Sequence, residues 1–302
     1  MWRSSCAPFY RLSSRPVPPI EGLFRFVRAC SVVASKSVDF SCLEGVPAKR
    51  ILGVSFFDGD LDAAISHCSN GGLVVAPSGP GLANDLLRDP SYGYALLRAD
   101  LVLPDSGLMT LWWNRRTKDA SDELQRISGL LFLKAFIRAE SDGALRNSFW
   151  IMPDSEQDED NRKWLAEEAG LTVPDEAVYH APIYSKSGEL ADKDLLGRIR
   201  VRSPRVIVVN LGGGVQERLG LYLRENLSGS PLILCTGAAL AFLSGRQARI
   251  PDWADRLYLG WLLRCISAPR SFIPRYWAAR KLVGLLRRYG SESPLGAGEG
   301  PC

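Results

Sequence analysis

Between residues 51 and 235 the sequence alternates short apolar runs with longer segments of helical spacing, and this alternation limits the fold more than any other feature. Strands are predicted at 51–57, 72–76, 100–104, 148–152, 178–184, 205–211 and 232–235, and the last of these is expected to close the sheet. Strands and helices that alternate at this spacing predict a mostly parallel, doubly wound α/β sheet with helices on both faces.

The parts of the chain outside this alternation differ in composition. Residues 1–47 are expected to form a disordered N-terminal extension, although the three Arg and absent acids of the first twenty residues also resemble a transit peptide. Residues 48–250 are predicted to be the α/β core. Residues 251–289 are predicted to be a basic helical appendage with helices at 253–266 and 272–289. The Gly/Ser/Pro-rich residues 290–302 predict a disordered tail.

Positive charge is concentrated near the C-terminus. Ten Arg or Lys and two Asp between residues 246 and 289 give +8, whereas the whole chain carries +4, so the remainder carries −4. Interleaved Trp and Tyr residues make this segment suitable for an anionic membrane surface or for a diphosphate. A helical pair packed on the sheet with a solvated basic face is the alternative. Nucleic acid is not expected as a partner, because no recognisable binding motif accompanies the charge.

Cysteine and histidine usage argues against a metal centre or a disulfide scaffold. The seven cysteines are scattered without CxxC spacing, which is typical of free thiols in a reducing compartment. Only two histidines are present, and His180 is expected to be a structural hydrogen-bonding residue. No apolar run reaches the ~18 residues of a spanning helix, so any membrane contact is expected at the surface.

The stretch 100–108 carries the first candidate for a reacting group. Its apolar run ends in a proline, and Asp105 follows immediately before a small-residue turn and a helical pattern. In an open α/β sheet the carboxyl ends of the strands deliver side chains into the ligand crevice. The alternative is that Asp105 is the N-cap of the following helix, since Asp is a preferred cap residue.

Two Gly-rich turns follow predicted strands, at 77–81 and 212–217. Such turns let the backbone approach a phosphate at a helix N-terminus. Neither matches a complete dinucleotide fingerprint or a P-loop, and tight strand-to-helix packing explains them equally well. Arg126, Gln216 and Glu217 are candidates for holding a polar ligand. A surface charge or a first-turn acid is the alternative for these residues.

Several stretches together resemble the WecG/TagA/CpsF glycosyltransferases, which act on undecaprenyl-diphosphate-linked sugars in bacterial envelope synthesis. Residues 51–54 resemble the opening strand of the family, 99–105 its "ADLVLPDG" motif, and 126–129 its "RVxG" motif. Leu211-Gly212 with Gln216-Glu217 resembles "GLGxPKQE", and 237–245 resembles "GGAFDFLAG". The similarity covers about residues 50–278. Its C-terminal part includes Trp253, Arg256, Leu257, Leu259, Trp261, Leu262, Arg264, Pro269, Arg270, Arg275 and Tyr276.

The resemblance implies a metal-independent inverting transferase with a Rossmann-like sheet and an appendage that completes the site at the membrane. It implies a UDP-sugar donor and a polyprenyl-diphosphate-linked acceptor, with no cofactor. The enzyme would be cytoplasmic and peripherally bound to the inner face of the membrane, and homo-oligomer formation is left open. Asp105 would be the general base. The substrate-binding residues would be Ser78, Arg126, Gly212, Gly213, Gln216, Glu217, Arg256, Arg264 and Arg270.

The chain departs from the family pattern at polar positions. Ala76-Pro77-Ser78 stands where the family has Thr-x-Asn, Val215 replaces a lysine, Ala241 replaces an aspartate, and Ser106 follows Asp105. Lost polar contacts would change which sugar is accepted. Two alternative functions remain. One is a nucleotide-sugar or lipid-diphosphate binding protein that has lost the reaction. The other is a Rossmann-type oxidoreductase, which the missing dinucleotide-binding fingerprint disfavours.

Overall fold

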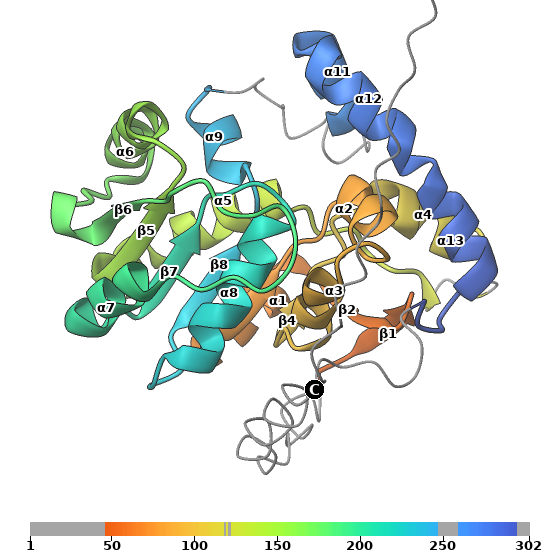
Figure 1. The fold of residues 1–302 in the computed structure, drawn as a ribbon, viewed down its shortest axis with the longest axis horizontal. Coiled ribbons are helices and arrows are strands. Elements are labelled where there is room, and N and C mark those ends of the chain that lie inside the picture. The colour runs from red at the N-terminus through yellow and green to blue at the C-terminus, as the bar shows by residue number, and fades with distance from the viewer. Residues whose placement is uncertain (1–45, 118, 120–121, 247–258, 295–302) are drawn as a thin grey trace, which may run out of the picture. The chain divides into compact units, whose positions relative to one another are not determined.

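A six-stranded parallel sheet lies between two layers of helices in the computed structural model, which describes residues 46–117, 119, 122–246 and 259–294 (Figure 1). The strand order is β4-β3-β8-β7-β5-β6, and each neighbouring pair is parallel. The predicted α/β class is therefore confirmed. The strands are β3 (Gly72–Val75), β4 (Leu101–Val102), β5 (Ser148–Met152), β6 (Val178–His180), β7 (Val206–Val209) and β8 (Leu232–Cys235).

Strand β8 occupies the middle of this sheet. It pairs with β3 on one side and β7 on the other, so the prediction that residues 232–235 close the sheet is wrong. The chain passes from β3 to its neighbour β4 at one edge of the sheet and then crosses to β5 near the opposite edge. This path leaves room between β3 and β5, where β7 and then β8 are added. All four β8 residues are buried, as a central strand requires.

Alternate residues along each strand feed two separate hydrophobic cores, as the two-residue side-chain period of a strand dictates. One core contains Leu73, Val75 and Ile207 together with side chains from α2, α3, α7 and α8. The other contains Val74 and Val208 together with side chains from α1, α5, α6 and α9. These helices are α1 (Leu61–His67), α2 (Gly79–Asn84), α3 (Pro90–Leu97), α5 (Gly129–Glu140), α6 (Ser155–Ala169), α7 (Lys193–Arg202), α8 (Val215–Asn226) and α9 (Ala239–Leu243); α4 (Gly107–Asn114) also packs on the first core.

Polar caps explain where most of these helices begin. A Ser or Asp side chain accepts a hydrogen bond from a backbone N–H in the first turn of every helix from α1 to α7. Such caps satisfy N–H groups that have no partner within the helix. The caps are Asp60, Ser78, Asp89, Ser106, Ser128, Asp154 and Asp192. Short 3-10 turns in the described part of the chain include those at Cys68–Asn70, Ala144–Asn147 and Asp175–Ala177.

The segment 51–57, predicted as one strand, belongs to a hairpin. Strand β1 (Ala48–Ile51) pairs antiparallel with β2 (Val54–Phe57) around Leu52 and Gly53, whose φ angles are 53° and 79°. Two positive φ values suit a tight hairpin turn but are unusual for leucine. The chain beyond the last helix supports this turn, because Leu52 N donates to Gly290 O (2.8 Å) and Gly53 N donates to Ser291 O (3.2 Å).

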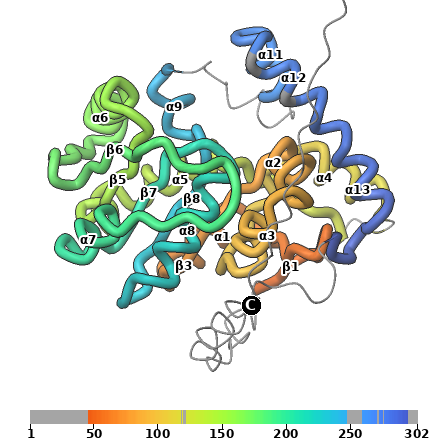
Figure 2. Tube along the Cα trace, viewed as in Figure 1, coloured from red at the N-terminus to blue at the C-terminus, as the bar shows by residue number. Residues whose placement is uncertain are grey.

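Three helices, where two were predicted, make up the described part of the appendage: α11 (Gly260–Ser267), α12 (Pro269–Ala279) and α13 (Lys281–Tyr289). Proline disfavours the helical conformation in the residue before it, so Pro269 explains the break between α11 and α12 at Ala268. Figure 2 traces α12 and α13 beside α2 and α4, against which they pack. No helix in the described ranges is long and apolar enough to span a bilayer.

Candidate active site

A cavity of about 270 Å³ lies at the carboxyl edge of the sheet, between the starts of several helices and the appendage. Three larger hollows among the described residues, of about 970, 760 and 390 Å³, are lined by none of the predicted site residues. Seven predicted residues line the cavity: Asp105, Ser78, Gly212, Gly213, Gln216, Glu217 and Arg264. The predicted residues thus converge from positions 78 to 264 on one place.

Asp105 lies in the loop between β4 and α4, with its side chain partly buried in the cavity wall. Its backbone N–H donates to Leu103 O (2.9 Å), which turns the chain sharply after the strand. Ser106 Oγ, rather than the Asp105 carboxylate, caps α4. The alternative interpretation of Asp105 as the cap of that helix is therefore wrong. Its Oδ1 instead accepts a hydrogen bond from Gly129 N at the start of α5 (3.2 Å).

Arg126 is brought next to Asp105 by the loop that precedes α5. Its Nε donates to the backbone oxygen of Asp105 (2.8 Å), and its Nη2 lies 3.6 Å from the Asp105 Oδ1. Arg126 is not among the cavity-lining residues. The guanidinium therefore holds the carboxylate and its loop in place, and direct binding of a ligand by Arg126 stays a prediction.

Gln216 and Glu217 form a buried hydrogen-bonded link between the loops that follow β7 and β8. Gln216 Oε1 accepts from Gly237 N (2.7 Å), and its Nε2 donates to Glu217 Oε1 (3.1 Å). Glu217 Oε2 accepts from Gly214 N (2.6 Å). Burial raises the pKa of the Glu217 carboxyl to about 7, although both hydrogen bonds favour the ionised form. Glu217 is thus a first-turn acid, as the alternative interpretation stated, and it also lines the cavity.

Small residues let the helix starts meet closely at the sheet edge. A side chain at Gly79 would come within 2.9 Å of Ser106 Oγ, and one at Gly129 within 3.0 Å of Thr236 O. The N-termini of α4, α5 and α8 lie at or beside the cavity through Asp105, Gly129 and Gly213. Backbone N–H groups at helix starts favour a bound anion such as a phosphate. Ser78 Oγ accepts from Gly81 N as the cap of α2 (3.3 Å).

Arg264 of α11 lines the cavity from the appendage side. Its Nη1 donates to Tyr276 Oη (3.1 Å), its Cζ lies 4.3 Å from the centre of the Phe242 ring, and its Nε is buried without a hydrogen-bond partner. Arg270 is exposed at the start of α12 and does not line the cavity. Arg256 lies outside the described residues, so its predicted role in substrate binding stays a prediction.

Among the cavity-lining residues that were not predicted from the sequence, two are polar and buried. Asn210 follows β7 and Thr236 follows β8, and both are buried, with exposed fractions of 2% and 6%. Their side-chain atoms Asn210 Oδ1 and Thr236 Oγ1 have no hydrogen-bond partner. The available signal was a polar residue directly after each of two buried apolar runs.

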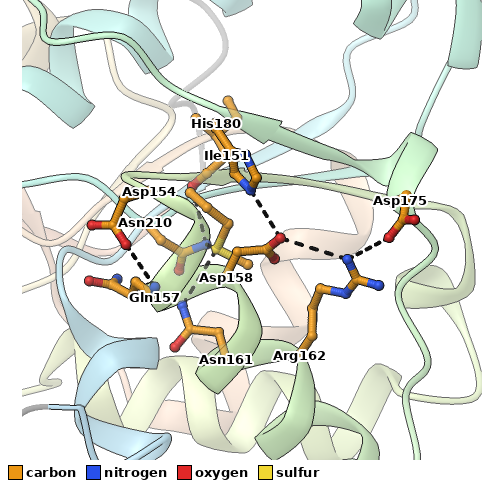
Figure 3. Close-up of polar contacts among 10 residues, drawn as sticks. Ile151, Asp154, Gln157, Asp158, Asn161, Arg162, Asp175, His180 and Asn210 are labelled. Atoms are coloured by element: carbon orange, nitrogen blue, oxygen red, sulfur yellow. Dashed lines mark hydrogen bonds and ion pairs between the residues drawn. The ribbon is translucent and has the colours of Figure 1, made fainter.

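His180 belongs to the edge strand β6 and is not a cavity-lining residue, and Figure 3 shows its contact with Asp158. Its Nε2 lies 3.0 Å from Asp158 Oδ2, which agrees with the predicted structural hydrogen-bonding role. Arg162 lies 3.7 Å from the same carboxylate oxygen and 2.7 Å from Asp175 Oδ1. Within the described part of the chain, no three His, Cys, Asp or Glu side chains are grouped as metal ligands would be.

Similarity to known proteins extends over most of the chain. Residues 49–293 match the sequence profile of the family described as "Glycosyl transferase WecG/TagA/CpsF family". The chain is also 23% identical over 244 residues to an N-acetylglucosaminyldiphosphoundecaprenol N-acetyl-beta-D-mannosaminyltransferase of Bacillus spizizenii. That alignment covers 76% of this chain and 90% of the relative.

Proposed function

Since the chain belongs to the WecG/TagA/CpsF family of glycosyltransferases, we propose that it transfers a sugar from a UDP-sugar to a polyprenyl-diphosphate-linked acceptor at an anionic membrane surface. The sugar is N-acetylmannosamine or a related hexose, and the transfer inverts the anomeric carbon. The Bacillus relative, whose name gives an N-acetylmannosaminyl transfer to a lipid-diphosphate-linked sugar, supports the choice of transferred sugar and of acceptor. The product would serve envelope or exopolysaccharide synthesis.

Asp105 is the general base in this proposal. It takes the proton from the acceptor hydroxyl as that oxygen attacks the anomeric carbon and the bond to UDP breaks. A positioned base typically contributes ~10²–10⁴-fold to the rate. The observation that carries the proposal is the carboxylate of Asp105, held in the cavity wall by Gly129 N and by Arg126.

Positive charge is needed where the nucleotide diphosphate leaves, because negative charge develops there in the transition state. Arg264 and the helix starts that line the cavity are suited to this role. We assign the other two appendage arginines that were predicted to bind substrate, Arg256 and Arg270, to the lipid diphosphate. In this account the protein supplies the positive charge without a metal ion or cofactor.

The appendage surface supports membrane association. Large apolar side chains are exposed on α11 and α12, and Arg280 lies over the ring of one of them, Trp277. A helix surface with Trp and Lys or Arg suits the interface of an anionic bilayer. The exposed apolar residues are Trp261, Leu262, Ile266, Ile273 and Trp277. This surface would bring the acceptor to a cavity that the same helices line.

The deciding experiment is transfer from UDP-N-acetylmannosamine to a short-chain polyprenyl-diphosphate N-acetylglucosamine by the wild type and by Asp105→Asn. The variant keeps the side-chain shape and is expected to lose ~10²–10⁴-fold in kcat, with UDP-sugar binding within about twofold of wild type and an unchanged melting temperature. Full turnover by Asp105→Asn excludes Asp105 as the base. Donor binding without any transfer by the wild type would instead support the rival binding protein.

A further inference from the structure

The residues after the central strands form a row on one face of the sheet. Val74, Leu234 and Val208 belong to the core that α5, α6 and α9 cover. Side chains two positions apart along a strand point the same way, so Ala76, Thr236 and Asn210 continue this face beyond the strand ends. All three line the cavity. Thr236 follows β8 and Asn210 follows β7, and these two strands are paired in the sheet.

Both polar members of this row have an oxygen without a partner. Asn210 Oδ1 and Thr236 Oγ1 are buried and accept no hydrogen bond. Buried polar atoms in native proteins are almost always hydrogen-bonded, because an unpaired one destabilises the fold. Two unpaired oxygens on neighbouring strands, in the wall of one cavity, therefore indicate a ligand that supplies the missing hydrogen.

The amide of Asn210 is oriented by its surroundings (Figure 3). Its Nδ2 lies 3.4 Å from Ile151 O and 3.5 Å from Met152 Sδ. Asn161 of α6 also donates to Met152 Sδ (3.5 Å), and its Oδ1 accepts from Ser244 Oγ (2.8 Å). Because the Asn210 nitrogen is used in this way, its carbonyl oxygen is the atom left to bind a ligand. That oxygen can only accept, whereas the Thr236 hydroxyl can accept or donate.

The rest of the cavity wall fits a sugar ring. Leu130 of α5 and Phe242 of α9 line the same cavity and supply apolar surface. Gln216 and Glu217 also line it but use their polar atoms on the loops that follow β7 and β8. The two unpaired oxygens, Asn210 Oδ1 and Thr236 Oγ1, are therefore suited to hydrogen-bond a polar substituent of the ligand.

We propose that Asn210 and Thr236 are specificity-determining residues that bind an N–H or O–H group of the sugar carried by the nucleotide donor. This inference rests on the proposed function, because it takes a sugar nucleotide to be the occupant of the cavity. The group is either the N–H of an acetamido substituent or a ring hydroxyl. Either one can donate a hydrogen bond to the Asn210 oxygen.

The test compares the Kd of UDP with those of UDP-N-acetylmannosamine and UDP-mannose, by calorimetry, in the wild type and Thr236→Val. The wild type is expected to bind at least one sugar nucleotide more tightly than UDP. Thr236→Val keeps the side-chain shape and is expected to reduce this preference about five- to tenfold while the Kd of UDP stays within about twofold. A loss with the acetamido sugar alone identifies the N–H, and a loss with both sugars identifies a hydroxyl.

Further variants separate binding from folding. Thr236→Ser keeps the hydroxyl and should retain the preference, and Asn210→Ala should lower it as Thr236→Val does. The melting temperature of ligand-free Thr236→Val should be unchanged or higher, because the substitution removes an unpaired buried hydroxyl. Thr117→Val and Asn147→Ala, whose side chains bond Asn114 O and Ser203 O outside the cavity, are matched controls.

Two outcomes contradict the inference, and a third contradicts the proposed function. If Thr236→Val and Asn210→Ala alter the binding of UDP and of the UDP-sugars equally, or alter neither, these residues do not read the sugar. If the wild type binds none of the three nucleotides, the donor class itself is wrong, and that failure is visible without any variant.

Discussion

The floor and the cover of the cavity are built in different ways. The floor consists of the carboxyl edge of the sheet and the adjoining helix starts, where Asp105, Gln216 and Glu217 are held by backbone N–H groups. The cover consists of α11 and α12, which direct Arg264 and Tyr276 toward the cavity. On their outer surface Trp261, Ile266 and Trp277 are 49%, 68% and 65% exposed.

This difference separates two requirements of the proposed reaction. Groups that stabilise a transition state act best when they are fixed in advance, as the floor residues are. A surface that meets a bilayer must instead present apolar and cationic side chains outward, as the cover does. Arg264 lies where the two regions meet, since it belongs to the cover and packs on Phe242 of α9. If the floor and the cover have separate roles, substitutions in the two regions should affect different measured properties.

Apart from Asp105→Asn, the largest effect is expected for Arg264→Gln. If this guanidinium stabilises the departing diphosphate, its loss should lower kcat by ~10²–10³-fold with little change in vesicle binding. The measurement is steady-state transfer with a soluble short-chain acceptor, with and without a chelator, which should not affect turnover. Arg146→Gln, which removes an exposed guanidinium paired with Asp142, is the control. An equal loss in both variants, or a strict need for Mg²⁺ or Mn²⁺, would contradict the role of Arg264.

A smaller effect on stability is expected from the floor residue Glu217. Its folded pKa of about 7 lies above the ordinary value of 4.5. Between about pH 4.5 and pH 7 the folded protein therefore holds a proton on Glu217 that the unfolded chain has lost. The stabilising effect of this protonation is complete below about pH 4.5. It is lost as the pH rises through 7 and amounts to roughly 3 kcal/mol in total.

Thermal unfolding of wild type and Glu217→Gln between pH 5 and pH 8 tests this prediction. The wild-type melting temperature should fall by several degrees more than that of the variant, because the glutamine does not titrate. Glu189→Gln, at an exposed position, should melt like the wild type. Parallel curves for wild type and Glu217→Gln would show that Glu217 is ionised throughout this range.

The smallest effect is expected on the outer surface of the cover. Trp277→Ser should weaken binding to vesicles rich in anionic lipid roughly tenfold, because the buried area of one large apolar side chain is lost. Ile183→Ser removes an exposed apolar side chain outside the appendage and should leave vesicle binding unchanged. Both variants should retain transfer to a soluble acceptor. Equal binding by wild type and Trp277→Ser would place the membrane contact elsewhere.

Local signals in the sequence were enough to predict much of the fold. Strands were expected at 72–76, 148–152 and 232–235, where β3, β5 and β8 lie, because each of these ranges is a short apolar run. The hairpin was missed because its turn uses Leu52, a poor residue for positive φ, which the distant Gly290 supports. The central place of β8 was missed because its neighbours depend on the path of the whole chain.

The site was predictable to a similar extent. The position of Asp105 at a strand end was enough to place it in the cavity. Its contact with Arg126 could not be derived, because it depends on how the loop before α5 returns to β4. Asn210 and Thr236 were missed because a side chain becomes unpaired only through its tertiary surroundings.

The bonds from Leu52 and Gly53 to Gly290 and Ser291 affect how the appendage can be studied. A shortened protein that ends before Trp253 would lose these bonds, and it would also expose the surfaces on which Leu282 and Leu286 pack. Such a truncation would weaken the N-terminal hairpin together with any lipid contact, so poor vesicle binding or low activity would have two indistinguishable causes. Single substitutions on the outer surface avoid this ambiguity, and a purification tag is better joined after Pro294 than in place of the preceding residues.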